Sequence, residues 1–137
     1  MKKVDYAYLA GILDGEGCVR IRKRKNADET VYFGSVISVE MTTEYIPTLF
    51  QFAFGGSINR VGRGENNKDS FVWTLTGKQA LDCLKTLYPY LILKKPNADI
   101  LIKTFKDIPK GYHLNSMERA IAEANAKAIK VLNKRGK

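Results

Sequence analysis

The segment from Leu9 to Gly17, Leu-Ala-Gly-Ile-Leu-Asp-Gly-Glu-Gly, constrains the fold of this chain more than any other stretch. Ala7, Gly11 and Gly15 recur at every fourth position, so a helix would carry them on one nearly flat face. Glycine costs roughly 1 kcal/mol relative to alanine inside a helix, so this spacing predicts a face that another helix approaches closely. The flanking charges and the short apolar run exclude a membrane-spanning segment, and contact between two copies of the chain is the natural use of such a face.

Two carboxylates, Asp14 and Glu16, stand at the end of this helix and alternate with glycines. An acidic residue at the end of a tightly packing helix, followed at once by a basic strand, suggests metal-assisted chemistry on nucleic acid. The opposing interpretation is a helix that ends on Gly15 or Gly17 as a C-cap, with both carboxylates simply solvated. For an arbitrary sequence that second interpretation would be preferred.

Leu9 to Gly17 also resembles the signature of the LAGLIDADG homing endonucleases, from which it differs by hydrophobic exchanges, by glycine at the seventh place and by glutamate at the eighth. The resemblance implies a DNA-cutting enzyme in which two signature helices pack together at the centre. It implies that Glu16 binds the catalytic metal, Mg²⁺ or Mn²⁺, with help from the carbonyl of Gly15, and that Asp14 satisfies backbone donors near the partner helix. The predicted dimer interface comprises Ala7, Ala10, Gly11, Asp14 and Gly15.

The chain carries a single copy of this motif, and its 137 residues are the length of one domain. We therefore expect one endonuclease domain over residues 1–137, with a core at about 4–107 and a C-terminal helical extension at about 114–133. Two active sites then require two chains. The prediction is a homodimer with the signature helix on its two-fold axis, acting on a pseudo-palindromic DNA site.

Charge agrees with a polyanionic partner, because 23 Lys and Arg residues outweigh 14 Asp and Glu residues and give a net charge of +9. This balance alone does not separate double-stranded DNA from RNA or from an anionic membrane surface. The charged start of the chain argues against a signal peptide, so we expect an intracellular protein, cytoplasmic in a prokaryote and organellar in a eukaryote. Cys18 and Cys83 lack metal-ligand spacing and are interpreted as reduced thiols, and with His113 as the single histidine a zinc site is not expected.

Alternating apolar and polar residues predict two hairpins, the first from residues 19–24 and 31–41 and the second from residues 57–61 and 71–75. Surface strands are often charged without contacting anything. With the signature present, we expect the polar faces of these strands and the loop of the second hairpin to contact the major groove. The predicted DNA-binding residues are Arg20, Arg22, Arg24, Tyr32, Ser38, Glu40, Ser57, Asn59, Arg63, Lys68 and Ser70.

Helices are expected over residues 44–54, from a capping box at Thr76 to Gln79, from Pro96, and over residues 115–133. The order through the third helix is αββαββα, which makes the chain α+β. The resemblance implies the same order, with a saddle-shaped antiparallel sheet over the duplex, helices on its far side and C-terminal helices added. The last helix is predicted to bury the stripe Met117, Ile121, Ala124, Ala128, Ile129 and Leu132.

The run from Leu91 to Ala98 is similar to the family segment that places a basic residue in the cleavage pocket. Lys94 occupies the matching position, and the adjacent Lys95 is the alternative. Thr43 matches a position where related enzymes hold a polar side chain that orients water, but a helix N-cap is the preferred interpretation of this threonine.

The resemblance therefore implies a site-specific endonuclease that hydrolyses both DNA strands with divalent metal and leaves short 3′ overhangs, an activity typical of intron homing. An RNA-binding intron maturase and a non-cleaving DNA-binding regulator on the same fold are alternatives, as is a basic structural RNA-binding protein. The presence of Glu16 and Lys94 favours the endonuclease.

Overall fold

A computed structural model of the chain describes residues 2–62, 64–65, 68–106, 108 and 114–135. The predicted order αββαββα is confirmed, and it is followed by a short 3₁₀ helix and further helices. Arg63 and His113 lie outside the described residues. The elements are α1 (Lys3–Glu16), β1 (Gly17–Lys25), β2 (Val31–Met41), α2 (Tyr45–Phe54), β3 (Ser57–Val61), β4 (Ser70–Thr76), α3 (Gly77–Leu87), η1 (Tyr88–Tyr90), α4 (Lys95–Phe105) and α5 (Ser116–Arg135).

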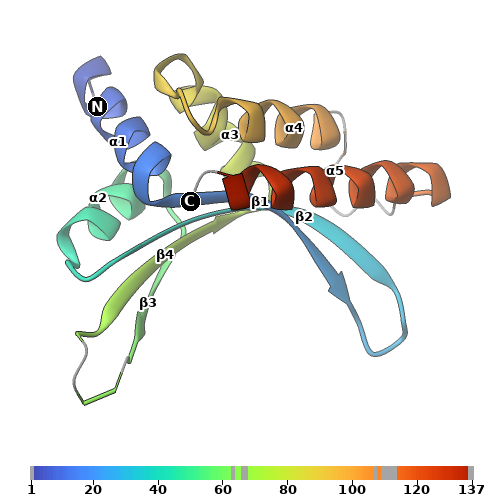
Figure 1. The fold of residues 1–137 in the computed structure, drawn as a ribbon, viewed down its shortest axis with the longest axis horizontal. Coiled ribbons are helices and arrows are strands. Elements are labelled where there is room, and N and C mark those ends of the chain that lie inside the picture. The colour runs from blue at the N-terminus through green and yellow to red at the C-terminus, as the bar shows by residue number, and fades with distance from the viewer. Residues whose placement is uncertain (1, 63, 66–67, 107, 109–113, 136–137) are drawn as a thin grey trace.

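The four strands form one antiparallel sheet in the order β1-β2-β4-β3, as the predicted α+β class requires. Figure 1 shows this sheet as an arch, with all helices on its convex side and the two hairpins reaching down as arms on either side of an open concave face. Within the described part of the chain, no helix is both long enough and apolar enough to cross a membrane.

Strand register separates the sheet into a buried face and a face without helices. Gly17 pairs with Val39 and Val39 pairs with Trp73, so these residues share one face, which the helices cover. Residues one position further along each strand point to the other face. The buried face supplies a large part of the core, through Val19, Ile21, Ile37, Val39, Trp73 and Leu75.

Gly17 is needed where α1 turns directly into β1. A Cβ atom at this position would lie 2.7 Å from the carbonyl oxygen of Leu13, so a side chain does not fit. Gly17 is the C-cap of α1 and adopts an extended conformation with φ −92°, and its N–H donates to Leu13. The helix thus ends at Glu16, with no linker between helix and strand.

The prediction that Ala10 lies in the dimer interface is wrong. Its exposed fraction is 0 %, because it packs with Leu9 and Leu13 in the core of its own chain. The other predicted small residues of α1, Ala7, Gly11 and Gly15, are exposed.

The predicted apolar stripe of the last helix is wrong in most of its members. Met117 is 74 % exposed and Ile121 is 52 % exposed, and Ala124 and Ala128 are also exposed, whereas Ala122 and Ile129 are buried. Polar contacts explain the rotation, because Asn125 donates to Thr104 at 2.8 Å and Asn97 donates to Asn133 at 2.9 Å, which turns an asparagine-bearing face of α5 inward.

The N-termini of α3 and α5 are capped differently. Asn115 and Glu118 form a capping box, with each side chain accepting the other residue's backbone N–H. Thr76 is the N-cap of α3 but makes no side-chain capping bond, so the predicted box there is wrong. Gly77 explains the difference, since its φ of +66° turns the chain sharply between β4 and α3.

Candidate nucleic-acid interface

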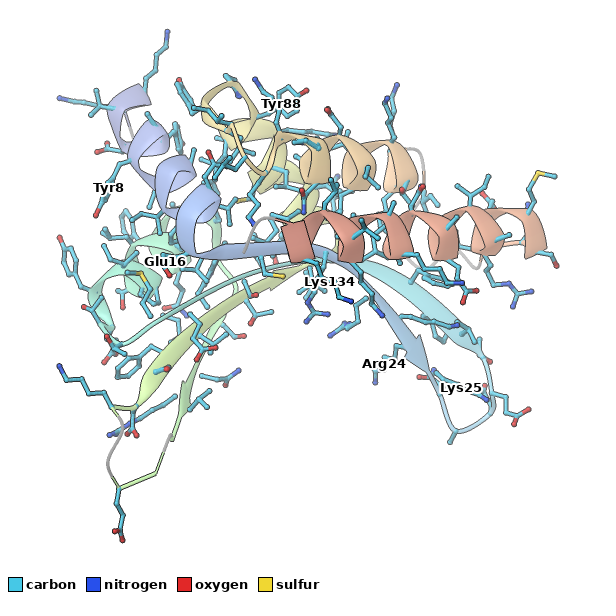
Figure 2. The ribbon with its side chains drawn as sticks, in the orientation of Figure 1. Tyr8, Glu16, Arg24, Lys25, Tyr88 and Lys134 are labelled. Carbon is cyan, nitrogen blue, oxygen red and sulfur yellow. The ribbon has the colours of Figure 1, made fainter. Side chains whose placement is uncertain are left out.

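Glu16 is exposed at the last position of α1, where the helix runs into β1 (Figure 2). The C-terminal end of a helix carries partial negative charge and carbonyl oxygens without intrahelical donors. A carboxylate is disfavoured there unless a cation is close. Among the residues that the structure describes, no basic side chain forms an ion pair with Glu16, and no cluster of three potential metal ligands occurs.

Asp14 performs the predicted task of satisfying backbone donors, and the donors belong to its own chain. Its two carboxylate oxygens accept the N–H groups of Ile92 at 2.8 Å and Lys94 at 2.9 Å. These bonds bring the start of α4 to the same end of α1 that carries Glu16. The sequence placed the residue but gave no indication of these two donors.

Lys94 and Lys95 differ in their surroundings. The ammonium of Lys95 lies 5.0 Å from the centroid of the Tyr88 ring, a cation–π arrangement. The Tyr88 hydroxyl donates to Asp99 at 2.7 Å, and this hydrogen bond raises the pKa of Tyr88. Lys94 is the half-buried N-cap residue of α4, and within the described chain its ammonium has no ion pair. The geometry therefore favours Lys94 over Lys95 as the cation available to a ligand.

Thr43 lies just past the end of β2 and takes part in the start of α2. Its hydroxyl accepts the backbone N–H of Tyr45 at 3.3 Å, but Thr43 is not the N-cap residue, so the capping interpretation is wrong by one position. The helix begins at Tyr45, with Glu44 as its formal N-cap residue.

The concave face gathers the predicted DNA-binding residues of β1. Arg20, Arg22 and Arg24 are exposed and stand opposite Val36, Gly34 and Tyr32 of β2. Figure 2 shows Arg24 toward the end of this hairpin. Ser38 and Glu40 lie on the same face further along β2, and Cys18 pairs with Ser38. The alternation read from the sequence is thus confirmed for the first hairpin.

The second hairpin extends this face with polar, mostly uncharged residues. Ser57 and Asn59 of β3 are exposed and pair with Thr74 and Val72 of β4. Lys68 is exposed in the connecting loop. Ser70 lies on the same face but is only 6 % exposed, which counters the prediction that it contacts DNA.

Comparisons of the structure show what this architecture is similar to. The homing endonuclease I-CvuI, in complex with the I-CreI target in the presence of Mg, superposes with a TM-score of 0.77 at 23 % identity, over 95 % of this chain and 82 % of that chain. The archaeal intron-encoded homing endonuclease I-Vdi141I complexed with DNA gives a TM-score of 0.78 at 16 % identity, over 96 % and 86 %. The I-SmaMI LAGLIDADG homing endonuclease bound to cleaved DNA gives 0.69 at 20 % identity, over 90 % of this chain and 43 % of that chain.

This is the fold of the LAGLIDADG homing endonucleases. No protein-family model matches the chain, and no curated protein matches it. The LAGLIDADG fold is therefore shared at low sequence identity, and the similarity is carried by architecture together with the short signature at the end of α1.

Two asparagines that the sequence did not single out connect the helices to β1, one of the two edge strands of the LAGLIDADG sheet. Asn97 is buried and donates to the carbonyl oxygen of Val19 at 3.2 Å and to Asn133 at 2.9 Å. Asn133 in turn donates to the sulfur of Cys18 at 3.8 Å. These contacts attach α4 and α5 to the first residues of β1, immediately after Glu16. The available sequence signal was the position of Asn97 four residues before Leu101 and eight before Phe105, on the buried face of α4.

Proposed function

We propose that this chain is a homodimeric, site-specific endonuclease that hydrolyses both strands of a long, pseudo-palindromic DNA duplex with divalent metal and leaves short 3′ overhangs. The observation that carries the proposal is the position of Glu16, an exposed carboxylate at the negative end of α1 where the helix enters an arginine-bearing strand. The similar structures, which are complexes of homing endonucleases with DNA, support DNA as the ligand.

The residues at the end of α1 suit a Mg²⁺-type cation. Such ions bind hard oxygen ligands and use few protein carboxylates, because phosphate oxygens and water complete their coordination. Glu16 and the carbonyl oxygen of Gly15 provide oxygen ligands in each chain. A single carboxylate per chain is consistent with a site that is completed by the scissile phosphate and by a second copy of α1.

The exposed face of α1 supports pairing with a second copy. A Cβ atom at Gly11 or Gly15 would meet nothing within 4 Å, so the fold of one chain does not require either glycine. Two interior glycines are nevertheless costly in a helix, and close approach of another helix accounts for them. Val4 is 77 % exposed and Tyr8 is 48 % exposed on the same side, which adds apolar surface for a partner to cover. This chain also spans less than half of I-SmaMI, so one copy leaves the larger part of that chain unmatched.

The residues around Glu16 have different roles in the proposed hydrolysis. A bound divalent cation would supply an activated water and neutralise the leaving oxygen. Glu16 holds that cation, and Asp14 fixes the backbone of Lys94 at the same helix end. The ammonium of Lys94 then stabilises negative charge that develops on the phosphate in the transition state. Thr43 would orient water through its hydroxyl, which keeps its own proton while it accepts the N–H of Tyr45.

The test begins with a randomised duplex library incubated with the protein and Mg²⁺, from which cleaved sites are sequenced. Cleavage and binding of the selected site are then compared for the unmodified protein, Glu16→Gln, and Asp82→Asn as a control at an exposed carboxylate of α3. We expect Glu16→Gln to lose cleavage by about a hundredfold or more while binding is kept. The control variant should match the unmodified protein.

Each alternative result has a specific meaning. Cleavage by Glu16→Gln at the unmodified rate would remove the proposed metal role. Tight binding of a selected duplex without cleavage by the unmodified protein would favour a DNA-binding regulator, and preferential binding of structured RNA would favour a maturase. A monomer on a half-site would refute the homodimer.

A further inference from the structure

Gly34 stands in the middle of β2, and nothing in the fold requires a glycine there. Residues Gly17 to Lys25 pair one by one with Val39 to Val31, so this pairing contains no bulge. The described glycines with positive φ are found elsewhere in the chain, at Gly55, Gly56, Gly64 and Gly77. A Cβ atom at Gly34 would meet nothing within 4 Å.

Glycine inside a strand weakens the sheet, because it forfeits side-chain packing and loses more backbone entropy on folding than other residues. Bulge, positive φ and tight packing are absent at Gly34, and the close approach of a ligand to the backbone is a remaining reason for a glycine in a strand. Gly34 faces the concave side, opposite Arg22, so the ligand would be one that enters this face.

A hollow of about 330 Å³ lies over this glycine, with Gly34 in its wall. Exposed Arg22 and Arg24 flank it from β1, and none of the described residues that line it is acidic. The hollow is lined by Arg22, Arg24, Asn26, Tyr32, Phe33 and Gly34.

Arginine next to a recess favours one kind of ligand within a DNA duplex. The planar guanidinium matches the O6 and N7 acceptors of guanine in the major groove. A β-ribbon enters that groove most deeply where its side chains are smallest, and at Gly34 the backbone itself is accessible. A phosphate would also be attracted by two arginines but does not need a recess in the strand.

We propose that the hollow over Gly34 takes the major-groove edge of one guanine-containing base pair in each half-site, read by Arg22 or Arg24, and that Gly34 is a specificity-determining residue. The proposal rests on the proposed function, since it needs duplex DNA on the concave face.

The experiment compares the cleaved-site preferences of the unmodified protein, Gly34→Ala, Gly34→Gln and Arg22→Ala in the same randomised library. Lys25→Gln is the matched control, because Lys25 lies on the opposite face of the same hairpin. Thermal melting and total duplex binding are recorded for each variant, so that altered folding is separated from altered recognition.

We expect Gly34→Ala to melt at or above the unmodified temperature, since the site has room for the methyl group. Gly34→Gln should fill the hollow and shift the preference at one symmetric pair of positions from guanine toward adenine, the base that a glutamine amide matches. Arg22→Ala should lose roughly 5- to 150-fold in discrimination at that pair or the adjacent one. The control should leave all preferences unchanged.

Three results would overturn the proposal. A lower melting temperature for Gly34→Ala would show that folding requires the glycine. Uniformly weaker binding by Gly34→Gln and Arg22→Ala with unchanged base preferences would assign the hollow to a phosphate, while the endonuclease function would stand. Failure of the unmodified protein to bind any duplex would overturn this proposal together with the proposed function.

Discussion

The carboxylate of Asp14 accepts the backbone N–H of Lys94 at 2.9 Å, which ties the last turn of α1 to the first turn of α4. Its other oxygen accepts the N–H of Ile92 at 2.8 Å. Lys94 is the N-cap residue of α4, so the carboxylate also lies near the positive end of that helix. The residue proposed to hold metal and the cation proposed to face the phosphate are therefore connected through one side chain.

Replacing Asp14 tests this connection. Asp14→Ala leaves two backbone donors without their acceptor, and we expect the free energy of unfolding to fall by about 1–3 kcal/mol. Asp14→Asn keeps one acceptor oxygen and should lose less. Denaturant unfolding measures the stability, and cleavage at saturating DNA should fall more than binding does. Asp82→Asn is the surface control. If Asp14→Ala and Asp14→Asn had the same free energy of unfolding as this control, the role of these hydrogen bonds would be contradicted.

We expect opposite effects from replacing the two adjacent lysines, Lys94 and Lys95. Lys94→Ala should reduce the cleavage rate at saturating DNA by about 100-fold or more and change binding little, because the charge acts mainly in the transition state. Lys95→Ala removes the contact with the Tyr88 ring and should cost about 0.5–1 kcal/mol of stability while leaving cleavage intact. Single-turnover cleavage and thermal melting on both variants decide the assignment, and the reverse pattern would transfer the role to Lys95.

Much of the fold follows from local sequence patterns. Arg20, Arg22 and Arg24 were placed on one face because side chains alternate along a strand, and the observed register keeps them there. The segment from Leu9 to Gly17 predicts where α1 ends and that its glycines lie on an outer face. Both predictions use local properties, namely the spacing of residues along a helix and the free-energy cost of glycine within it.

The features that sequence patterns missed depend on contacts between distant residues. Asn97 reaches both Val19 and Asn133, and such bonds set the rotation of α5 against the apolar stripe suggested by Met117 and Ile121. The donors that Asp14 satisfies lie 78 and 80 residues further along the chain. Periodicity carries no information on either pairing.

The proposed dimer predicts the effect of bulk on the flat face of α1. Gly11→Gln places a long polar side chain where one chain alone offers open space, so the protomer should fold as before. Two helices could then no longer approach closely, and we expect a monomer in sedimentation analysis and loss of double-strand cleavage. Lys3→Gln, at an exposed residue in the first turn of the same helix, should remain a dimer. A dimeric Gly11→Gln protein would place the interface elsewhere.

Cysteine reactivity reports on the concave face. Cys83 is buried, and burial raises the pKa of its thiol, so it should resist alkylation until the protein unfolds. Cys18 is half-buried on the edge strand β1 opposite Ser38, where its sulfur also accepts Asn133, and it should react more readily than Cys83 in the folded protein. Bound duplex should protect Cys18, and mass spectrometry with and without the selected DNA site measures this. Equal labelling of Cys18 in both conditions would contradict DNA binding on the concave face.

The ion pair between Lys23 and Glu123, with N and O at 2.9 Å, predicts a pH-dependent attachment of α5 to β1. The hydrogen bond from Lys23, and next its charge, lower the pKa of Glu123 below the ordinary value of 4.5. A lowered pKa means that the stabilisation is complete above that value and is lost as the pH falls through the folded-state pKa. Glu123→Gln should therefore melt slightly below the unmodified protein at pH 7, and the difference should vanish in acid and shrink in high salt, because both side chains are exposed. Glu65→Gln, at another exposed glutamate, controls for the loss of one charge. If both variants lowered the melting temperature equally at pH 7, the specific pairing of Glu123 with Lys23 would be refuted.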